Sequence, residues 1–221
     1  MSVWAVLASA GRGERLGGSR PKAFAKLHDR PLLAESLERL ESSAWIDAIV
    51  IVAPPGWEEP SILVAEELAC TKVVACASGG DTRAESVRAG VAEVGGDAAV
   101  IAVHDAARPI LPGEVLERVL TALNEGWDGV VPALPLPDTI KRVQGGRIVE
   151  TLPRVELVAA QTPQAFLAPV LREALAGDLV EATDCSGLVE ARGGRVTTVP
   201  GDRRLLKVTD RADLELVASF S

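Results

Sequence analysis

Residues 3–22 read VWAVLASAGRGERLGGSRPK, an apolar run followed directly by a loop rich in glycine and arginine. The run from Val3 to Ala8 has the length and composition of a buried strand, so the loop follows the carboxyl end of that strand. Its glycines let the backbone turn tightly and bring N–H groups close to an oxyanion such as phosphate. From Gly11 to Lys22 the loop holds four basic residues and one acidic residue, whereas the whole chain has a net charge of −8. A cationic loop in an acidic protein favours an anionic small ligand.

The common phosphate-binding motifs do not match this loop. Leu16 stands where the dinucleotide fingerprint has its third glycine, and Gly18 is followed by Ser19 and Arg20 where a P-loop has Lys and then Ser or Thr. Neither a dehydrogenase nor a P-loop NTPase is therefore favoured. A plain solvated connection stays open as the alternative, because most loops are surface connections.

Length and composition indicate one globular domain over residues 1–221, with 48% hydrophobic residues to form its core. The three cysteines, Cys70, Cys76 and Cys185, are odd in number and lack metal-ligand spacing, which predicts buried free thiols in the reducing cytoplasm. No apolar run approaches the roughly 18 residues of a membrane helix, and no basic segment precedes the first apolar run, so neither membrane insertion nor secretion is expected. The acidic charge and 3% aromatic content argue against nucleic-acid binding.

Short β-branched runs alternate with segments whose apolar residues recur at helical spacing. This alternation predicts an α/β fold of the Rossmann-like type, with a mainly parallel sheet and helices on both faces. Strands are expected at 3–8, 48–53, 72–77, 98–103, 129–136 and 195–199. Helices are expected at 31–43, 58–69, 82–94, 112–124, 168–176, 183–192 and 212–220.

The alternation of strands and helices is interrupted at residues 138–154. Two short β-like runs, 139–143 and 147–152, flank Gln144, Gly145 and Gly146, a sequence typical of a hairpin with a glycine turn. No helix follows to bury this hairpin, so we expect a projecting β-hairpin arm that contacts a partner subunit. A plain surface hairpin fits the pattern equally well.

Small, acidic and basic residues follow several of the expected strands. Ligands bind at the carboxyl ends of strands in a parallel sheet, so these residues are candidates for a site that takes sugar hydroxyls and phosphates. They are Ser78 to Arg83, His104 to Pro109 and Pro137 to Thr139. Lys207 lies inside an apolar run just before the last helix, where a ligand-binding cation and a solvated lysine are both open.

These motifs follow the order found in one family. They are Gly11-x-Gly13-x-Arg15 with Pro21-Lys22, Gly79-Gly80-Asp81-x-Arg83-x-x-Ser86-Val87, Val103 to Pro109, Asp138-Thr139-x-Lys141, Gln161-Thr162-Pro163-Gln164, Thr183-Asp184, and Lys207-Val208-Thr209. The chain resembles the 2-C-methyl-D-erythritol 4-phosphate cytidylyltransferase family over nearly its whole length. The resemblance implies a nucleotidyltransferase domain that transfers CMP from CTP to methylerythritol phosphate and releases pyrophosphate.

The resemblance also implies roles for charged residues. Arg15 and Lys22 match a catalytic pair that neutralises charge on the α-phosphate in the transition state. Lys207 and Arg154 match two further catalytic cations that hold the acceptor phosphate, with Arg154 supplied by the neighbouring subunit of a homodimer. The acceptor phosphate is itself an anionic nucleophile, so His104 is expected to be a local hydrogen-bonding group and not a general base.

Two further groups of residues are implied by the same match. The CTP-binding group comprises Ala8, Ser9, Ala10, Gly11, Gly13, Gly80, Asp81 and Ser86. The acceptor-binding group comprises Asp105, Arg108, Thr139 and Thr162. Mg²⁺ is implied as a cofactor held mainly by the CTP phosphates and water, with no dedicated protein ligands.

The chain departs from the family pattern at two places, and two other functions remain open. Ala8-Ser9 stands where Pro-Ala is common, and Cys185 stands where a second acidic residue commonly follows Asp184. Arg12 and Arg20 are expected to be surface charges. The competing functions are nucleotidyl transfer to another phosphorylated sugar or alcohol, and nucleotide binding by a regulator without catalysis.

Overall fold

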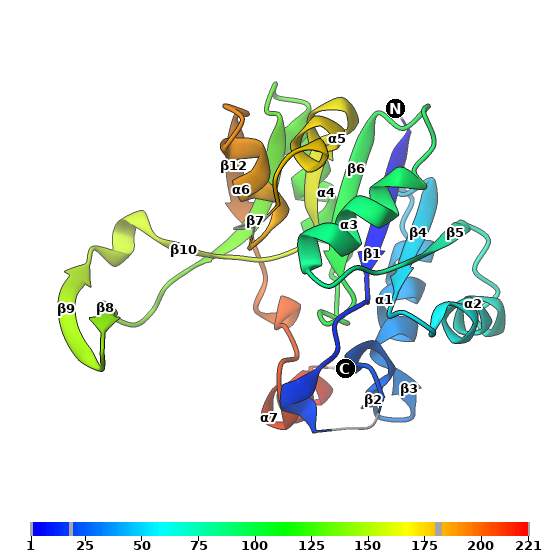
Figure 1. Cartoon of the computed structure of the whole chain (residues 1–221), viewed down its shortest axis with the longest axis horizontal. Helices are drawn as coiled ribbons and strands as arrows, with labels where there is room; N and C mark the ends of the chain where they lie inside the picture. Colours follow the sequence, from blue (N-terminus) through cyan, green and yellow to red (C-terminus); the bar gives the residue numbers. More distant parts are fainter. Residues whose placement is uncertain (1, 18–19, 180–182, 221) are drawn as a thin grey trace.

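The computed structural model describes residues 2–17, 20–179 and 183–220. An eight-stranded sheet forms its framework, and a hairpin projects far from that sheet (Figure 1). The parallel strands are β1 (Val3–Ala8), β4 (Ala48–Ala53), β5 (Val73–Ser78), β6 (Val100–Asp105), β7 (Gly129–Pro135) and β12 (Val196–Pro200). The mainly parallel sheet expected from the sequence is confirmed, and each expected strand is present within two residues of its predicted ends.

Two strands of the sheet were not expected from the sequence. β11 (Gln164–Leu167) lies between β6 and β7 and runs antiparallel to both. β10 (Val158–Ala160) pairs with the far end of β7, on the side opposite β12. Both strands are too short, and too close to the prolines that flank them, to produce a distinct strand pattern.

Helices cover both faces of the sheet, as predicted. The helices are α1 (Leu32–Glu41), α2 (Glu58–Glu67), α3 (Arg83–Ala92), α4 (Gly113–Leu123), α5 (Ala168–Ala176), α6 (Cys185–Glu190) and α7 (Arg211–Ala218). One core cluster joins α1, α2 and α4 to one face, and a second joins α3, α5 and α6 to the other. α7 packs in a third, smaller cluster around Leu27 and Val208. Shorter elements are η1 (Glu14–Leu16), η2 (Lys22–Phe24), β2 (Lys26–Leu27), β3 (Arg30–Pro31), η3 (Arg154–Glu156) and η4 (Arg203–Leu205).

The predicted hairpin is confirmed as β8 (Ile140–Gln144) and β9 (Arg147–Leu152). Gly145 and Gly146 take φ values of 53° and 78°, which only glycine adopts readily, so the sequence fits this tight turn. All side chains from 141 to 151 are exposed, and the hairpin stands away from the sheet as an arm (Figure 1). The single chain therefore leaves both faces of the hairpin uncovered.

The three cysteines are free, but only Cys185 is buried, because Cys70 and Cys76 lie half-exposed near the sheet edge formed by β5. The expectation of buried thiols is therefore correct for one of the three. Among the described residues, no helix is long and apolar enough to cross a membrane.

Candidate active site

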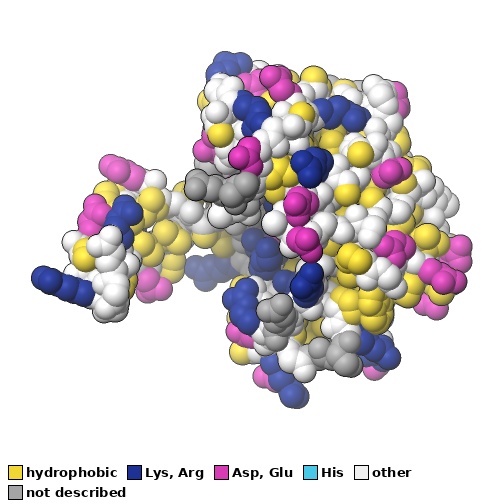
Figure 2. Space-filling view, viewed as in Figure 1, with side chains coloured by type: hydrophobic (Ala, Val, Ile, Leu, Met, Phe, Trp, Pro, Cys, Tyr) yellow, Lys and Arg dark blue, Asp and Glu magenta, His cyan; other side chains and the backbone are white. Residues whose placement is uncertain are grey.

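A cleft of about 720 Å³ opens at the carboxyl ends of β1, β5 and β6. Ala8, the last residue of β1, lies level with Asp105 of β6 on one side and with Val52 of β4 on the other, so the loops that follow these strands meet. Figure 2 shows Lys and Arg side chains gathered in the middle of the molecule, between the sheet and the part that contains α7. The lining comprises Ala8 to Gly13, Arg15, Lys22, Ala23, Gly80 to Arg83, Ser86, Asp105 to Ala107, Lys207 and Thr209.

The glycine-arginine loop folds back on itself to form one wall of this cleft. Gly13 has a φ of 71°, and a Cβ atom there would lie 2.7 Å from Cβ of Lys22. The Lys22 N–H group donates to the carbonyl of Gly11 at 3.4 Å. The close approach at Gly13 therefore places Arg15 and Lys22, seven residues apart in sequence, on the same cleft.

Ser9 anchors the start of the loop to the neighbouring strand. Its N–H and its hydroxyl both donate to the carbonyl of Val52, at 3.0 and 2.6 Å, and its side chain is buried. This chain has Ser9 at one of its departures from the family pattern. The hydroxyl bond to β4 supplies a local restraint on the loop.

The loop after β5 forms the opposite wall. The Ser86 hydroxyl donates to the carbonyl of Thr82 at 2.8 Å and accepts from the Gly80 N–H group at 3.1 Å. The side chains of Asp81 and Arg12 are 90% and 76% exposed, and they form an ion pair at 3.4 Å across the rim. Every residue predicted to bind CTP lines the cleft, and Arg12, predicted to be a surface charge, is both exposed and part of the lining.

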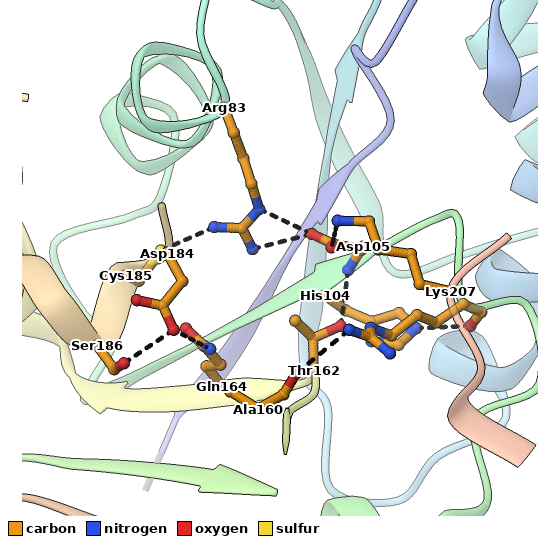
Figure 3. Close-up of polar contacts among 11 residues, drawn as sticks. Arg83, His104, Asp105, Ala160, Thr162, Gln164, Asp184, Cys185, Ser186 and Lys207 are labelled. Atoms are coloured by element: carbon orange, nitrogen blue, oxygen red, sulfur yellow. Dashed lines mark hydrogen bonds and ion pairs between the residues drawn. The ribbon is translucent and has the colours of Figure 1, made fainter. Parts of the chain in front are cut away.

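Asp105 lies at the floor of the cleft with two cationic partners (Figure 3). The Arg83 Nε and Nη2 atoms both donate to Asp105 Oδ1, at 3.0 and 2.9 Å, and Lys207 Nζ donates to Oδ2 at 2.7 Å. Burial by itself would raise the pKa of Asp105, but the charges of Arg83 and Lys207 outweigh it and hold that pKa well below its usual range. The carboxylate is therefore ionised at every physiological pH.

A second layer of hydrogen bonds fixes the backbone at Asp105. The Thr162 hydroxyl accepts from the Asp105 N–H group and contacts His104 Nδ1, both at 3.1 Å, and His104 Nε2 lies 3.1 Å from the Arg108 carbonyl. Burial lowers the pKa of His104 to about 4, so the ring is neutral. A carbonyl only accepts, so the proton is on Nε2, and the Thr162 hydroxyl donates to Nδ1. His104 is the local hydrogen-bonding group that the sequence predicts.

Lys22 lies in a strongly cationic environment. Burial lowers its pKa to about 8, and the charge of Lys207 acts in the same direction. Asp105 raises the pKa, whereas Arg15 and Arg108 lower it further. Such an arrangement is unfavourable without a counter-charge, so the cleft is suited to a polyanion.

Four predicted residues lie outside the cleft lining. Arg108 is half-buried behind it, where Nη1 donates to the Leu205 carbonyl at 2.5 Å and Nη2 to the Ala160 carbonyl at 3.4 Å. Thr162 is buried behind Asp105. Thr139 and Arg154 belong to the exposed arm, and the Arg154 guanidinium donates to the carbonyl of Pro137. Within one chain, the fold does not bring the arm residues to the cleft.

Arg83 was among the candidates that follow a predicted strand, but the sequence assigned it no role. It lies within the quoted motif around Gly80 and follows a predicted strand, so its position was a usable signal. Thr82, Ala106, Ala107 and Thr209 belong to the candidate segments and motifs without an assigned role, and they line the cleft. Ala23 also lines it and was not predicted. Arg20 borders a smaller hollow beside Trp57, outside the main cleft.

The cleft carboxylates, Asp81 and Asp105, are both paired with cations. In the part of the chain that the structure describes, no group of three or more His, Cys, Asp or Glu side chains is placed to hold a metal ion.

Known proteins with similar sequences and structures share one description. Residues 3–220 match the family model described as 2-C-methyl-D-erythritol 4-phosphate cytidylyltransferase. Curated relatives with that name include proteins of Frankia casuarinae, 45% identical over 99% of this chain and 80% of the relative, and Nocardia farcinica, 42% identical over 99% and 94%. The crystal structure of the enzyme with that name from Thermus thermophilus is similar with a TM-score of 0.81 at 32% identity, covering 100% of this chain and 98% of that one.

Proposed function

The chain belongs to the 2-C-methyl-D-erythritol 4-phosphate cytidylyltransferase family, and from this premise we propose how its residues carry out the reaction. The enzyme transfers CMP from CTP to 2-C-methyl-D-erythritol 4-phosphate and releases pyrophosphate, in isoprenoid precursor synthesis. The observation that carries the residue-level proposal is the single cleft that joins Arg15 and Lys22 to Asp105 and Lys207.

CTP binds between the two loops that form the walls of the cleft. The backbone from Ala8 to Gly13 follows the triphosphate, and the Gly80 to Ser86 segment reads the cytosine edge. Ser86 fixes the Gly80 backbone by a hydrogen bond, so the groups that face the base are held in place before the nucleotide arrives. Hydrogen bonds to the base edge provide discrimination against other nucleotides.

Arg15 and Lys22 act on the α-phosphate. A phosphate oxygen of the acceptor attacks the α-phosphorus, a new P–O bond forms, and the bond to the β-phosphate oxygen breaks as pyrophosphate leaves. Negative charge on the α-phosphate oxygens is greatest as the two bonds exchange. Fixed cations aimed at these oxygens lower the barrier without needing a proton-transfer residue.

The acceptor binds at the floor of the cleft. Lys207 holds its phosphate, and Asp105 accepts hydrogen bonds from its hydroxyl groups. Thr162 acts through the Asp105 backbone, whose N–H group donates to its hydroxyl. Arg108 acts through the Leu205 and Ala160 backbone, because its guanidinium donates to these two carbonyls behind the cleft. Their contribution is therefore to position the floor of the site.

The arm completes the active site of a second subunit in a homodimer, supplying Thr139 and Arg154 to the acceptor. Exposed apolar side chains on and beside the hairpin support this assignment, since such patches mark contact surfaces. They are Val143, Ile148, Val149, Val155 and Val158. Val155 is 90% exposed and directly follows Arg154.

Mg²⁺ bound together with CTP would be held mainly by triphosphate oxygens and water. When bound, the ion supplies positive charge that stabilises the departing pyrophosphate. The paired carboxylates of the cleft support this placement, because they are already neutralised by cations of the protein. We also propose a cytoplasmic location, which the three free thiols support.

CTP binding should depend on pH through Lys22. Its pKa of about 8 in the empty cleft must rise when a triphosphate binds, since an anion favours the charged ammonium. The affinity for CTP is then highest well below pH 8, where Lys22 is charged in the empty cleft. It falls as the pH rises toward the pKa of Lys22 in the complex. The dissociation constant should rise about fivefold from pH 8 to pH 9, by linkage. Calorimetry at pH 8.5 in buffers of different ionisation enthalpy should detect proton uptake.

A matched variant tests this assignment. Lys22→Arg keeps its charge throughout this range, so its CTP affinity should be nearly constant from pH 8 to pH 9. An equally steep fall in both proteins would assign the effect to another group.

A direct assay tests the function. Pyrophosphate release should require CTP and 2-C-methyl-D-erythritol 4-phosphate together, and ATP, GTP, UTP or other sugar and alcohol phosphates should support it poorly. Faster release with another acceptor would favour a different nucleotidyltransferase. CTP binding without release in any combination would favour a regulator.

A further inference from the structure

The two cationic partners of Asp105 differ in how many hydrogen bonds they donate to it and in how exposed they are. Arg83 reaches it from the first residue of α3 with two donors to one oxygen, whereas Lys207 reaches the other oxygen with one donor (Figure 3). The Arg83 side chain is 24% exposed and the Lys207 side chain is 37% exposed. The guanidinium is therefore the more enclosed partner, and the ammonium is nearer to the open cleft.

The other neighbour of Arg83 carries no charge. Nη1 of Arg83 lies 3.7 Å from the Sγ atom of Cys185, at the first residue of α6. Burial raises the pKa of the Cys185 thiol to about 11, although the nearby guanidinium lowers it somewhat, so the thiol is neutral. Among the described residues, Asp105 provides the only carboxylate in an ion pair with Arg83.

The charge balance of Arg83, Asp105 and Lys207 determines whether the Lys207 ammonium is available to bind an anion. One carboxylate faces two cations, so the trio has an excess of one positive charge. Because Arg83 is enclosed and makes two bonds to the carboxylate, it balances Asp105, and the excess charge remains on Lys207. Without Arg83, Lys207 would be the remaining described ion-pair partner of Asp105, so its charge would balance the carboxylate and would be less available to an incoming phosphate.

We propose that Arg83 is a positioning residue that balances Asp105 and thereby keeps the charge of Lys207 available to the acceptor phosphate. The inference rests on the proposed function, in which Lys207 holds that phosphate. Arg83 and Ser86 lie on the same turn of α3, so one helix start serves both substrates: Ser86 fixes the loop that faces the base, and Arg83 sets the charge at the acceptor floor.

The test is a set of steady-state measurements on Arg83→Gln. We expect KM for the acceptor to rise about ten- to hundredfold, because one partner of a buried charge pair is lost. The inhibition constant of inorganic phosphate, measured in competition with the acceptor, should rise by a similar factor. KM for CTP should change less than about threefold, because the CTP-facing backbone does not depend on this charge.

Two companion variants sharpen the result. Arg83→Lys keeps the charge with fewer donors, so its acceptor KM should lie between those of the wild type and Arg83→Gln. Arg88→Gln removes an exposed arginine from the same helix and should leave both constants unchanged.

Several outcomes would overturn the inference. One is an Arg83→Gln enzyme whose acceptor KM and phosphate inhibition constant both stay within about twofold of wild type. Another is an equal rise in KM for both substrates, which indicates a general structural role. If Arg83→Gln fails to fold, an acceptor KM within about twofold of wild type in Arg83→Lys would overturn it instead. A wild-type protein inactive with CTP and the acceptor would refute the proposed function, and phosphate binding measured by calorimetry would still test Arg83.

Discussion

Lys22→Met is expected to lower kcat by about a hundred- to a thousandfold, the usual cost of removing one fixed group that stabilises transition-state charge. The Lys22 ammonium lines the cleft and is partly withdrawn from water, so its field at the α-phosphate is weakly screened. KM for CTP should rise much less, since several backbone groups of the loop still hold the triphosphate. The measurement is pyrophosphate release at saturating substrates and pH 7, where wild-type Lys22 is charged.

Lys26→Met is the matched control for this substitution. Lys26 lies four residues further along the chain, on β2, and its side chain is exposed outside the cleft lining. The kcat of the Lys26→Met enzyme should equal that of the wild type. An unchanged kcat for Lys22→Met with a raised KM for CTP would mean that Lys22 contributes to ground-state binding alone.

The layout of the sheet could be predicted because its strands are buried on both faces. β4 consists of six buried residues, AIVIVA, which gives a continuous apolar run bounded by proline. The same reasoning missed β11, whose four residues begin with Gln164. That glutamine is buried, and its side-chain amide donates to Asp184, 20 residues away in sequence. A contact of this kind turns a polar residue into a core residue, and no local pattern indicates it.

The site residues differ in the same way: some can be recognised within one short segment, and others only through contacts between distant parts of the sequence. The glycine-arginine loop could be recognised because Gly13, Arg15 and Lys22 act within one short segment. The ion-pair partner of Arg83 could not be recognised in this way. The Arg83 guanidinium donates to Asp105, which is 22 residues away in sequence and lies on a different element. Charge pairing at this distance depends on where α3 begins relative to the end of β6, which only the folded chain defines.

Mixing two inactive variants should restore activity if Arg154 acts across a dimer interface. In a mixed dimer of Arg154→Ala and Lys22→Met, the intact cleft of the first chain receives the intact arm of the second. One of the two sites is then complete, and random mixing should recover about a quarter of wild-type activity, as expected for a two-fold symmetric dimer. The exposed position of Arg154 on the arm, outside the cleft of its own chain, is the reason for this expectation.

A second mixture separates this explanation from simple stabilisation by a folded partner. Lys22 and Lys207 both line the cleft of the same chain, so a mixed dimer of Lys22→Met and Lys207→Met contains no complete site and should stay inactive. Mixed dimers must be verified with differently tagged chains purified over two affinity steps. Recovery in the Arg154 mixture alone requires that the arm of one chain reaches the cleft of the other. A verified Arg154 mixture that stays inactive would confine Arg154 to its own chain, and the exposed apolar residues of the arm would then need another partner.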